Sequence, residues 1–299
     1  MISKLIDPKD FNYCVSKLRI FFMNRGFIEV YPNLIDSIPI INKNSKISKL
    51  YNFNKSIWSD NQIGQIWLDN ILLDNPELNG CFRITTNSIK DQKDFPIFEF
   101  GSKGNIDNLL SLEKSLLNYM GFVKRNVKIK NNINNRVTEK QEFGRLIGDK
   151  SEIDFLKKDY LSIDYLECLK KYGVHKFEHI DENRLCGDHG DVFIIKNYPV
   201  DIKPLWNIKI EDQTVKNINV LLHGKKTISS AEHSCDRETM KNLFKNQIGI
   251  ENLYNKFDKN IVNLELSEYF DKHFFPRCGG KIEITQMIHA LKISDLMEV

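Results

Sequence analysis

Near the C-terminus the chain reads Pro276-Arg277-Cys278-Gly279-Gly280-Lys281-Ile282-Glu283-Ile284-Thr285-Gln286-Met287-Ile288-His289-Ala290-Leu291. A glycine pair leads into the alternating segment Lys281–Thr285, which predicts a strand, and the apolar residues after it predict a short helix. Glycine has no Cβ, so it lets the backbone approach a flat ligand closely. A strand that turns directly into a helix aims its next side chain at that ligand. The stretch therefore predicts a site where the backbone can approach a flat ligand closely.

A second region predicts a β-hairpin. Strand patterns at Cys81–Thr86 and Phe95–Phe100 flank a short polar loop. Glu99 stands between Phe98 and Phe100, and successive side chains of a strand point to opposite faces. We therefore expect Glu99 to face a ligand while its two aromatic neighbours face the other way.

Two further segments contain candidate binding residues. The turn around Pro204-Leu205-Trp206-Asn207 can present an indole wall and an amide to a small polar ligand, or it can simply pack Trp206 in the core. Next along the chain, the strand Ile218–Leu222 is expected to pair with a strand near Thr227–Ile228, in a hairpin that continues to Ser234. Strands separated by long insertions, with helices outside, favour a mostly antiparallel sheet in an α+β arrangement.

These segments, in this order, resemble the catalytic domain of class II aminoacyl-tRNA synthetases. The closest resemblance is to the asparagine synthetase A and aspartyl/asparaginyl/lysyl branch. The helix Asp10–Asn24 followed by the strand Phe27–Tyr31 is similar to motif 1, the hairpin to motif 2, and the C-terminal stretch to motif 3. The resemblance implies an antiparallel sheet of six or seven strands flanked by helices. It also implies one domain over residues 1–299, with a polar insertion around 124–150 and no anticodon-binding domain.

The sequence departs from the family at the positions that hold ATP. In motif 3, Lys281 and Glu283 stand where the family has glycines, and Gln286 replaces the arginine. In motif 2, Lys90 replaces the arginine that grips the α-phosphate, and Gln92 replaces a glutamate. Lysine keeps the charge but loses the bidentate geometry of a guanidinium. The resemblance assigns the catalytic positions to Lys90 and Gln286, and it assigns ATP binding to Lys90, Gln92, Phe98, Gly279, Gly280 and Gln286.

The resemblance also implies an amino-acid pocket, formed by Glu99, Trp206, Asn207, Ser230, Glu232 and His233. Glu232 is retained from the family and would help to hold the amino group or a Mg²⁺ ion. His233 replaces an arginine, and histidine is mostly uncharged at neutral pH, which weakens any clamp on a carboxylate. Glu113, in the predicted helix Ile106–Met120, is expected to be solvated.

Two functions follow from the resemblance and stay open at this point. The first is an ATP-dependent, Mg²⁺-dependent amino-acid ligase that forms an adenylate of an aspartate-like substrate and then an amide or ester. The second is a catalytically inactive paralogue that acts as a binding or partner protein. The inactive paralogue stays open because the loss of one preorganised charge costs roughly 3 kcal/mol or more of transition-state stabilisation. Either protein is expected to form a homodimer through the N-terminal helix–strand segment.

Composition restricts the remaining possibilities. The formal net charge is only +3, and the one basic patch is Lys124–Arg136, so RNA binding is not favoured. The six cysteines are scattered, which favours reduced thiols in a cytoplasmic protein. No segment has the length of a signal peptide core or the roughly 20 apolar residues that span a bilayer. The sequence contains neither the P-loop nor the Rossmann glycine pattern.

A zinc site is the rival constellation. The candidate ligands fall close together in the sequence: Cys168, His175, His179, Cys186 and His189. His175 and His179 have a metal-ligand spacing, but the other gaps match no standard zinc motif.

Overall fold

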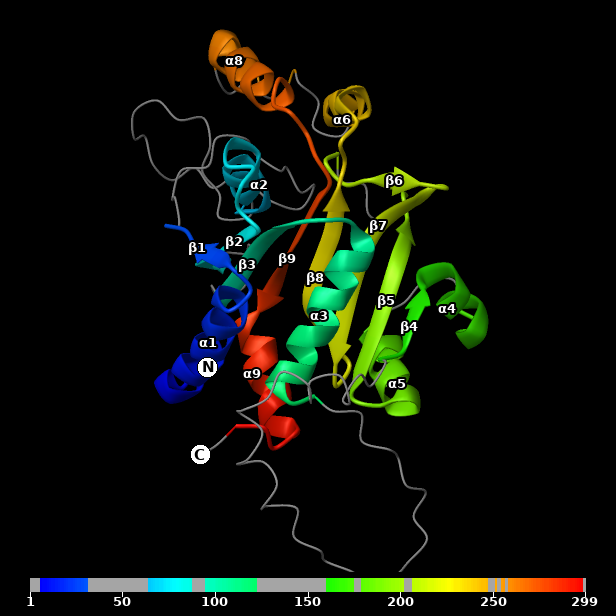
Figure 1. Cartoon of the computed structure of the whole chain (residues 1–299). Coiled ribbons are helices and arrows are strands. Elements are labelled where there is room, and N and C mark those ends of the chain that lie inside the picture. The colour runs from blue at the N-terminus through cyan, green and yellow to red at the C-terminus, as the bar shows by residue number, and fades with distance from the viewer. Residues whose placement is uncertain are drawn as a thin grey trace, which may run out of the picture.

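The computed structural model describes residues 6–31, 64–87, 95–122, 160–174, 179–201, 206–246, 251, 254–255 and 258–297. The strands are β1 (Phe27–Glu29), β2 (Gly80–Asn87), β3 (Phe95–Lys103), β4 (Ser162–Asp164), β5 (Val192–Pro199), β6 (Ile210–Glu211), β7 (Thr214–Leu222), β8 (Lys225–His233) and β9 (Arg277–Glu283) (Figure 1). The helices are α1 (Pro8–Met23), α2 (Gly64–Asp74), α3 (Ile106–Met120), α4 (Tyr165–Tyr172), α5 (His179–His189), α6 (Arg237–Phe244), α8 (Lys259–Phe270) and α9 (Ile284–Ile293). In these ranges no helix combines the length and apolarity needed to cross a bilayer.

The strands form a single sheet. Its order is β1-β2-β3-β9-β8-β7-β5-β4, and β6 pairs with β7 beside this path. The pairs β1–β2 and β4–β5 are parallel, whereas β2–β3, β3–β9, β9–β8, β8–β7 and β7–β5 are antiparallel. The expected α+β architecture with a mostly antiparallel sheet is confirmed. The described sheet has nine strands instead of six or seven, because three short strands, β1, β4 and β6, join its margins.

Three helices cover one face of the sheet, which we call the helix-covered face. α1, α3 and α9 lie against it side by side (Figure 1). The apolar core lies between them and the strands, and it includes Leu18, Leu117 and Ile288 from the helices and Phe98 and Ile282 from the strands. Phe22 of α1 packs its ring 4.9 Å from that of Phe98, centroid to centroid. This core fixes which side of each strand faces away from the helices.

On the opposite face, the described helices α2 and α5 lie at the two ends. α2 packs on β2 and β3, where Leu68 and Leu72 contact Cys81. α5 contacts β5, β7 and β8 at the other end. Between them, the outward-facing residues of β2, β3, β9 and β8 are mainly polar. We call this region the polar face.

Local sequence sets the ends of α3. The Asn105 side chain accepts hydrogen bonds from the amides of Asp107 and Asn108, and the Asn108 side chain accepts one from the Asn105 amide. This capping box satisfies amides that have no partner inside the helix. Gly121 ends the helix with φ +97°, a conformation that favours glycine. The helix therefore spans Ile106–Met120, as the sequence predicts.

Two sequence-based boundaries are corrected. The pattern Asp154–Tyr172 predicts one helix, but Ser162–Asp164 forms β4 beside β5, and α4 begins only at Tyr165. Tertiary pairing overrides helical periodicity there. The strand expected at Lys281–Thr285 is β9, which already begins at Arg277 and ends at Glu283.

The glycine pair consequently lies inside β9, between β3 and β8, and Gly280 has a packing reason to be glycine. A Cβ at Gly280 would lie 2.5 Å from Ser230 Cβ and 3.1 Å from Phe100 Cζ. Phe100 belongs to the apolar core of the helix-covered face. Gly280 is thus explained by close packing on that side, and not only by the approach of a ligand.

Candidate functional site

The regions that resemble motifs 2 and 3 are hydrogen-bonded neighbours in the sheet. Phe100 pairs with Gly280, and Gly101 pairs with Gly279. The two segments therefore meet in one sheet.

The cross-strand register aligns a row of polar residues over this surface. Arg83 pairs with Glu99, Glu99 with Lys281, Lys281 with Ser229, and Ser229 with Asn219. Paired residues of antiparallel strands share a face, so all five side chains lie on the polar face. We call these five residues the polar row, and it is the centre of the candidate site.

The first two members of the row form a buried ion pair. Arg83 Nε lies 2.8 Å from Glu99 Oε2, and the two side chains are only 1% and 2% exposed. The Arg83 guanidinium also lies 5.2 Å from the centre of the Trp67 ring. Each charge is compensated by the other, which is the usual condition for burying either one.

A second charged network lies near the row, where α2 meets the sheet. Asp69 of α2 accepts from Arg277 (2.9 Å) and from Tyr269 (3.4 Å) through Oδ2, and its Oδ1 lies 2.5 Å from Nδ1 of His233. Burial alone would raise the pKa of the Asp69 carboxyl, but Arg277 and His233 outweigh burial and lower it. The network fastens α2 and α8 to β8 and β9. The Nδ1 atom of His233 is therefore already engaged by Asp69.

Trp206 lies beside this network in an aromatic cluster. Its ring meets Phe244, Tyr269 and Phe270 edge-on, at centroid distances of 5.1, 5.5 and 5.8 Å. The indole is 1% exposed, and its Nε1 has no hydrogen-bond partner. The backbone carbonyl of Asn207 accepts from the amide of Ser234 at 2.8 Å. Of the two interpretations of this turn, the geometry fits core packing of Trp206 better than an open ligand wall.

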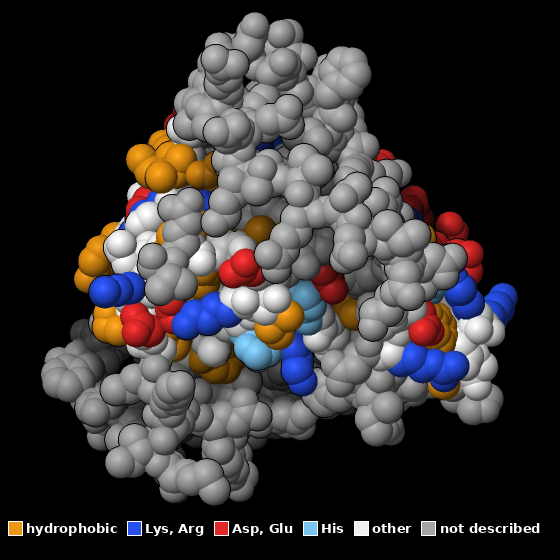
Figure 2. All heavy atoms as spheres, turned by 90° about the horizontal axis from the view of Figure 1, so that it is seen from below, with side chains coloured by type: hydrophobic (Ala, Val, Ile, Leu, Met, Phe, Trp, Pro, Cys, Tyr) orange, Lys and Arg blue, Asp and Glu red, His pale blue; other side chains and the backbone are white. Residues whose placement is uncertain are grey.

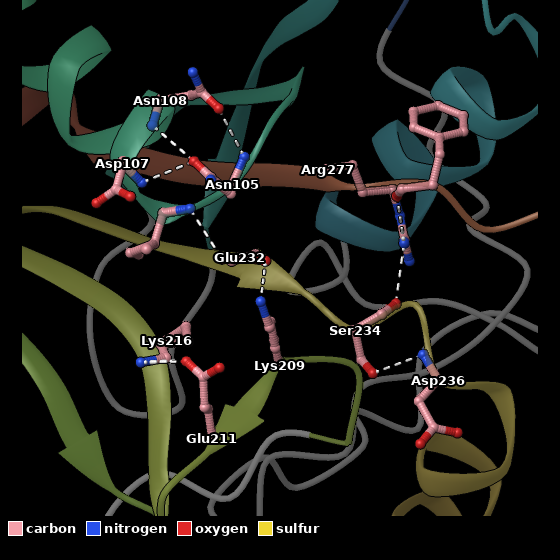
Figure 3. A network of polar contacts seen from close by, with 12 residues as sticks. Asn105, Asp107, Asn108, Lys209, Glu211, Lys216, Glu232, Ser234, Asp236 and Arg277 are labelled. Carbon is pink, nitrogen blue, oxygen red and sulfur yellow. Dashed lines mark hydrogen bonds and ion pairs between the residues drawn. The ribbon is translucent and has the colours of Figure 1, made fainter.

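Three of the expected ligand residues lie on the helix-covered face. Glu232 accepts from the amide of Ile106 and from Nζ of Lys209, each at 2.9 Å (Figure 3). Its carboxylate thus stabilises the N-terminus of α3, where unpaired amides favour an anion. Ser230 and Phe98 belong to the same face, because they pair with Gly280 and Ile282. Glu232 and Glu99 therefore lie on opposite sides of the sheet.

The remaining expected residues are placed as follows. Gln286 is half-buried in the first turn of α9. Lys90 and Gln92 lie outside the described residues, as does the segment Lys124–Arg136. Of the expected site residues, Glu99, Gly279 and His233 lie on the polar face. The strand register places Lys281 on the same face.

Sequence reasoning missed three charged residues of this face: Arg83, Asp69 and Arg277. A signal existed for Arg83, because Phe82-Arg83-Ile84 alternates like Phe98-Glu99-Phe100, and opposite charges at matching hairpin positions indicate a cross-strand pair. No comparable signal marks Asp69. It reaches His233 and Arg277 only through the tertiary packing of α2.

The zinc constellation does not assemble within the described residues. There, no three His, Cys, Asp or Glu side chains come close enough to hold a metal ion. The Nε2 atom of His189 lies 2.7 Å from the hydroxyl of Tyr172, and Cys186 is buried. His175 lies outside the described residues.

The described residues do not supply the groups that ATP and Mg²⁺ need. A phosphate requires cations that are not already neutralised, and Mg²⁺ requires accessible carboxylate oxygens. The arginines of the described polar face, Arg83 and Arg277, are buried against Glu99 and Asp69. Both oxygens of Glu232 are engaged on the other face. On the described polar face, Lys281 is half-exposed and the neighbouring Lys226 is exposed.

No protein-family model and no curated protein matches the sequence. Several solved structures are similar to this chain. Asparaginyl-tRNA synthetase from Pyrococcus horikoshii, complexed with asparaginyl-adenylate, superposes with a TM-score of 0.70 at 16% identity, over 95% of this chain and 65% of that one. Asparaginyl-tRNA synthetase from Entamoeba histolytica, also with asparaginyl-adenylate, gives 0.66 at 12% identity, over 96% and 64%. A putative aspartyl-tRNA synthetase from Leishmania major Friedlin gives 0.65 at 14% identity, over 96% and 62%.

The chain spans slightly less than two thirds of the length of these proteins. The match extends over nearly all of the present chain, with the strand order and flanking helices described above. The chain therefore has the fold of the catalytic domain of class II asparaginyl- and aspartyl-tRNA synthetases.

Proposed function

We propose that this chain is a synthetase-fold binding protein that does not form aminoacyl-adenylates. One observation carries the proposal: both arginines of the described polar face are buried and neutralised by a carboxylate, Arg83 by Glu99 and Arg277 by Asp69. Adenylation places negative charge on phosphate oxygens, and preorganised free cations provide most of its stabilisation. Cations that already have an internal partner would have to break that pair first.

The replaced glycines of β9 support the same proposal. Lys281 and Glu283 are two residues apart on one strand and share a face. Burial raises the pKa of the Glu283 carboxyl, and the charges of Lys281 and Lys226 oppose that rise. The charge of Lys281 is therefore partly balanced within the protein. Two long side chains also occupy the surface where the family has bare backbone.

The ligand proposed for this face is a small polar amino acid, without ATP. Ser229 and Asn219 extend the polar row beyond Lys281, and their hydroxyl and amide groups can donate to or accept from such a ligand. The chain would then act by binding, either of the amino acid or of a protein partner. The similar structures from Pyrococcus horikoshii and Entamoeba histolytica are complexes with asparaginyl-adenylate.

The second candidate is an ATP-dependent ligase acting on an aspartate-like amino acid. One observation favours it, because Lys281 is a half-exposed cation in the middle of the polar row. As a point charge it could contact a phosphate without bidentate geometry. This candidate needs ATP and Mg²⁺, whereas the binding protein needs neither.

Pyrophosphate exchange separates the two candidates. The purified chain is incubated with ATP, Mg²⁺ and each proteinogenic amino acid, and an active synthetase serves as the positive control. We expect no exchange above that of the K281A variant. In parallel, thermal unfolding is measured with each amino acid, with and without ATP. A stabilising amino acid whose effect ATP does not increase supports the binding protein, and exchange with any amino acid establishes the ligase.

A homodimer through the N-terminal helix–strand segment is also part of the proposal. Three large apolar side chains of that segment are about half-exposed, namely Ile20 (49%), Met23 (57%) and Ile28 (48%). β1 is at the edge of the described sheet, and an edge strand beside apolar side chains is a common interaction surface. Sedimentation should show a dimer that M23D/I28D dissociates. L264D, at an equally exposed leucine of α8, is the matched control and should leave the dimer intact.

Nucleic-acid binding is not part of the proposal. Viewed from below, the described surface shows basic and acidic side chains interspersed instead of a region of one sign (Figure 2). Exposed residues at this end include Lys225, Lys292 and Asp295. A polyanion is usually bound by a continuous basic surface.

A further inference from the structure

Glu113 is a buried carboxyl group on the helix-covered face. It lies in α3, where the sequence predicts a solvated residue, yet it is only 1% exposed. Neither of its oxygens has a hydrogen-bond partner. Every other buried carboxylate described above is bound to a cation or to backbone amides. Glu113 is therefore an exception that needs a physical explanation.

Among the described residues, no cation compensates the carboxyl of Glu113. α3 packs against β7, β8, β9 and α1. From β8, the hydroxyl of Ser230 lies close enough to favour the charged form of Glu113, but outside hydrogen-bond geometry. From β9, the group facing it is the thiol of Cys278, whose pKa is raised by burial and then by Glu113. α1 and β7 contribute to this core the buried side chains of Cys14, Leu18, Ile218 and Val220.

An unpaired carboxylate is strongly disfavoured in such a place. Moving an ion from water into an apolar core without a partner costs far more than giving the group a proton. Burial accordingly raises the pKa of Glu113 to about 8, and Ser230 only partly opposes the rise. The neutral acid can pack against the hydroxyl and thiol beneath it without a counter-ion.

We propose that Glu113 is a proton-dependent lock, which holds α3 on the sheet while it is a neutral acid and loosens α3 when it ionises. α3 is held to β8 at two points: Glu232 binds its N-terminus, and Glu113 lies over Ser230 in the middle of the helix. Ser230 in turn packs on Gly280. Ionisation of Glu113 draws water toward this contact. The strands at this contact, β8 and β9, carry the polar face on their other side. The lock therefore regulates the candidate site, whatever ligand that site binds.

The sign of the effect follows from linkage. The carboxyl binds its proton more tightly in the folded chain than in the unfolded chain, so stability is greatest below the unfolded pKa, about 4.3. It decreases as the pH rises toward the folded pKa of about 8. In that window the unfolded state carries one proton fewer, which lowers the folding constant by about tenfold per pH unit.

The test compares urea unfolding of the wild type and of E113Q between about pH 5.5 and 7.5. Glutamine has nearly the same shape and cannot ionise. We expect the folding constant of the wild type, relative to that of E113Q, to decrease by close to tenfold per pH unit. E167Q, at an exposed glutamate of α4, is the matched control and should show no such slope. If the ratio of the wild-type folding constant to that of E113Q does not change with pH, the lock is falsified.

A second measurement covers the case in which E113Q does not fold. Amide hydrogen exchange of the wild type is followed above and below the folded pKa of about 8 and corrected for the intrinsic rate. The lock predicts that α3 loses protection at high pH while α4 does not. If α3 and α4 respond alike, the proposal is overturned.

Discussion

The arginines of the polar face and Glu113 of the helix-covered face accommodate burial in opposite ways. On the polar face, Arg83 and Arg277 are inaccessible, and each has a carboxylate oxygen within 2.9 Å. On the helix-covered face, Glu113 is equally inaccessible and has no such partner. The polar face balances charge with charge, as Glu232 and Lys209 also do on the helix-covered face. Glu113 instead loses its charge by keeping a proton.

This difference gives the two faces opposite pH signatures. The pKa of Asp69 is lowered by its partners, so its contribution to stability is present above the unfolded value and is lost in acid. The pKa of Glu113 is raised by burial, so stability is lost as the pH rises. The fold should therefore be most stable between the two titrations. Each face can be perturbed separately at its own end of the pH scale.

Replacing Arg277 by methionine should have the largest effect. The variant leaves Asp69 buried without its cation, and such a loss costs about 3–5 kcal/mol of unfolding free energy. Urea unfolding near neutral pH measures the cost. R237M is the matched control, because Arg237 is exposed and lies 3.9 Å from its partner Asp271. Its cost should stay below about 1 kcal/mol.

Two further measurements sharpen the result for Arg277. The double variant D69L/R277M replaces the whole pair by apolar groups and should regain most of the lost stability. The difference in unfolding free energy between the wild type and R277M should also become smaller below about pH 4, where the carboxyl of Asp69 takes up a proton in the unfolded chain. A deficit that is independent of pH would mean that Arg277 stabilises the protein by packing and not by its charge.

Replacing Gly280 by alanine tests the contact between the two faces. The new Cβ would lie 2.5 Å from Ser230 Cβ and 3.0 Å from the carbonyl oxygen of Ser229. Overpacking of this kind costs about 1–3 kcal/mol. S230G removes one of the crowding atoms and should restore part of the stability of G280A. G187A is the control, because nothing lies within 4 Å of the added Cβ.

The fold was predictable because its signals are local and occur in a fixed order. The alternation around Glu99 correctly separates it from Phe98 and Phe100, which pack with the helices. The pairing of Ile218–Leu222 with the strand near Thr227–Ile228 is also confirmed, since Val220 pairs with Ile228. Each inference required only the two-residue period of a strand and nearby turns.

The candidate site was less predictable because it depends on which face each residue occupies. Glu232 and His233 are adjacent in the sequence, and they point to opposite sides of the sheet. A resemblance by motif does not resolve that difference unless the strand register is followed residue by residue. For Asp69 no sequence pattern would have helped, since its partners lie in β8 and β9.

Glu113 is the instructive failure. Its neighbours on the buried side of α3 are Leu109, Leu116 and Leu117, spaced three or four residues away. Helical periodicity therefore places position 113 in the apolar stripe. The expectation of a solvated residue followed the chemistry of glutamate instead of its position. A charged residue inside an apolar stripe is itself a signal of an unusual protonation state.

Removal of the Asn105 cap should weaken α3 and with it the helix-covered face. N105A loses the side chain that accepts from two helix amides, which costs about 0.5–2 kcal/mol. D164A is the comparison variant, because Asp164 occupies the same position before α4 and makes no side-chain capping bond. Its carboxylate accepts from Asn197 at 3.1 Å, so D164A loses one exposed hydrogen bond but no cap. Thermal unfolding of both variants should rank N105A as the less stable. An equal loss would show that the capping hydrogen bonds contribute little.

The smallest effect is expected at Arg19. Its ion pair with Glu29 has the same 2.8 Å separation as the pair of Arg83 and Glu99, but its side chains are 43% and 38% exposed. Water and salt screen an exposed pair, so R19M should cost only about 0.2–1 kcal/mol, measured in a double-mutant cycle with E29Q. Added salt should reduce that coupling, because exposed charges are screened. If R19M were as costly as R83M, distance alone would govern these ion pairs, and burial would no longer explain the contrast between buried and exposed charge.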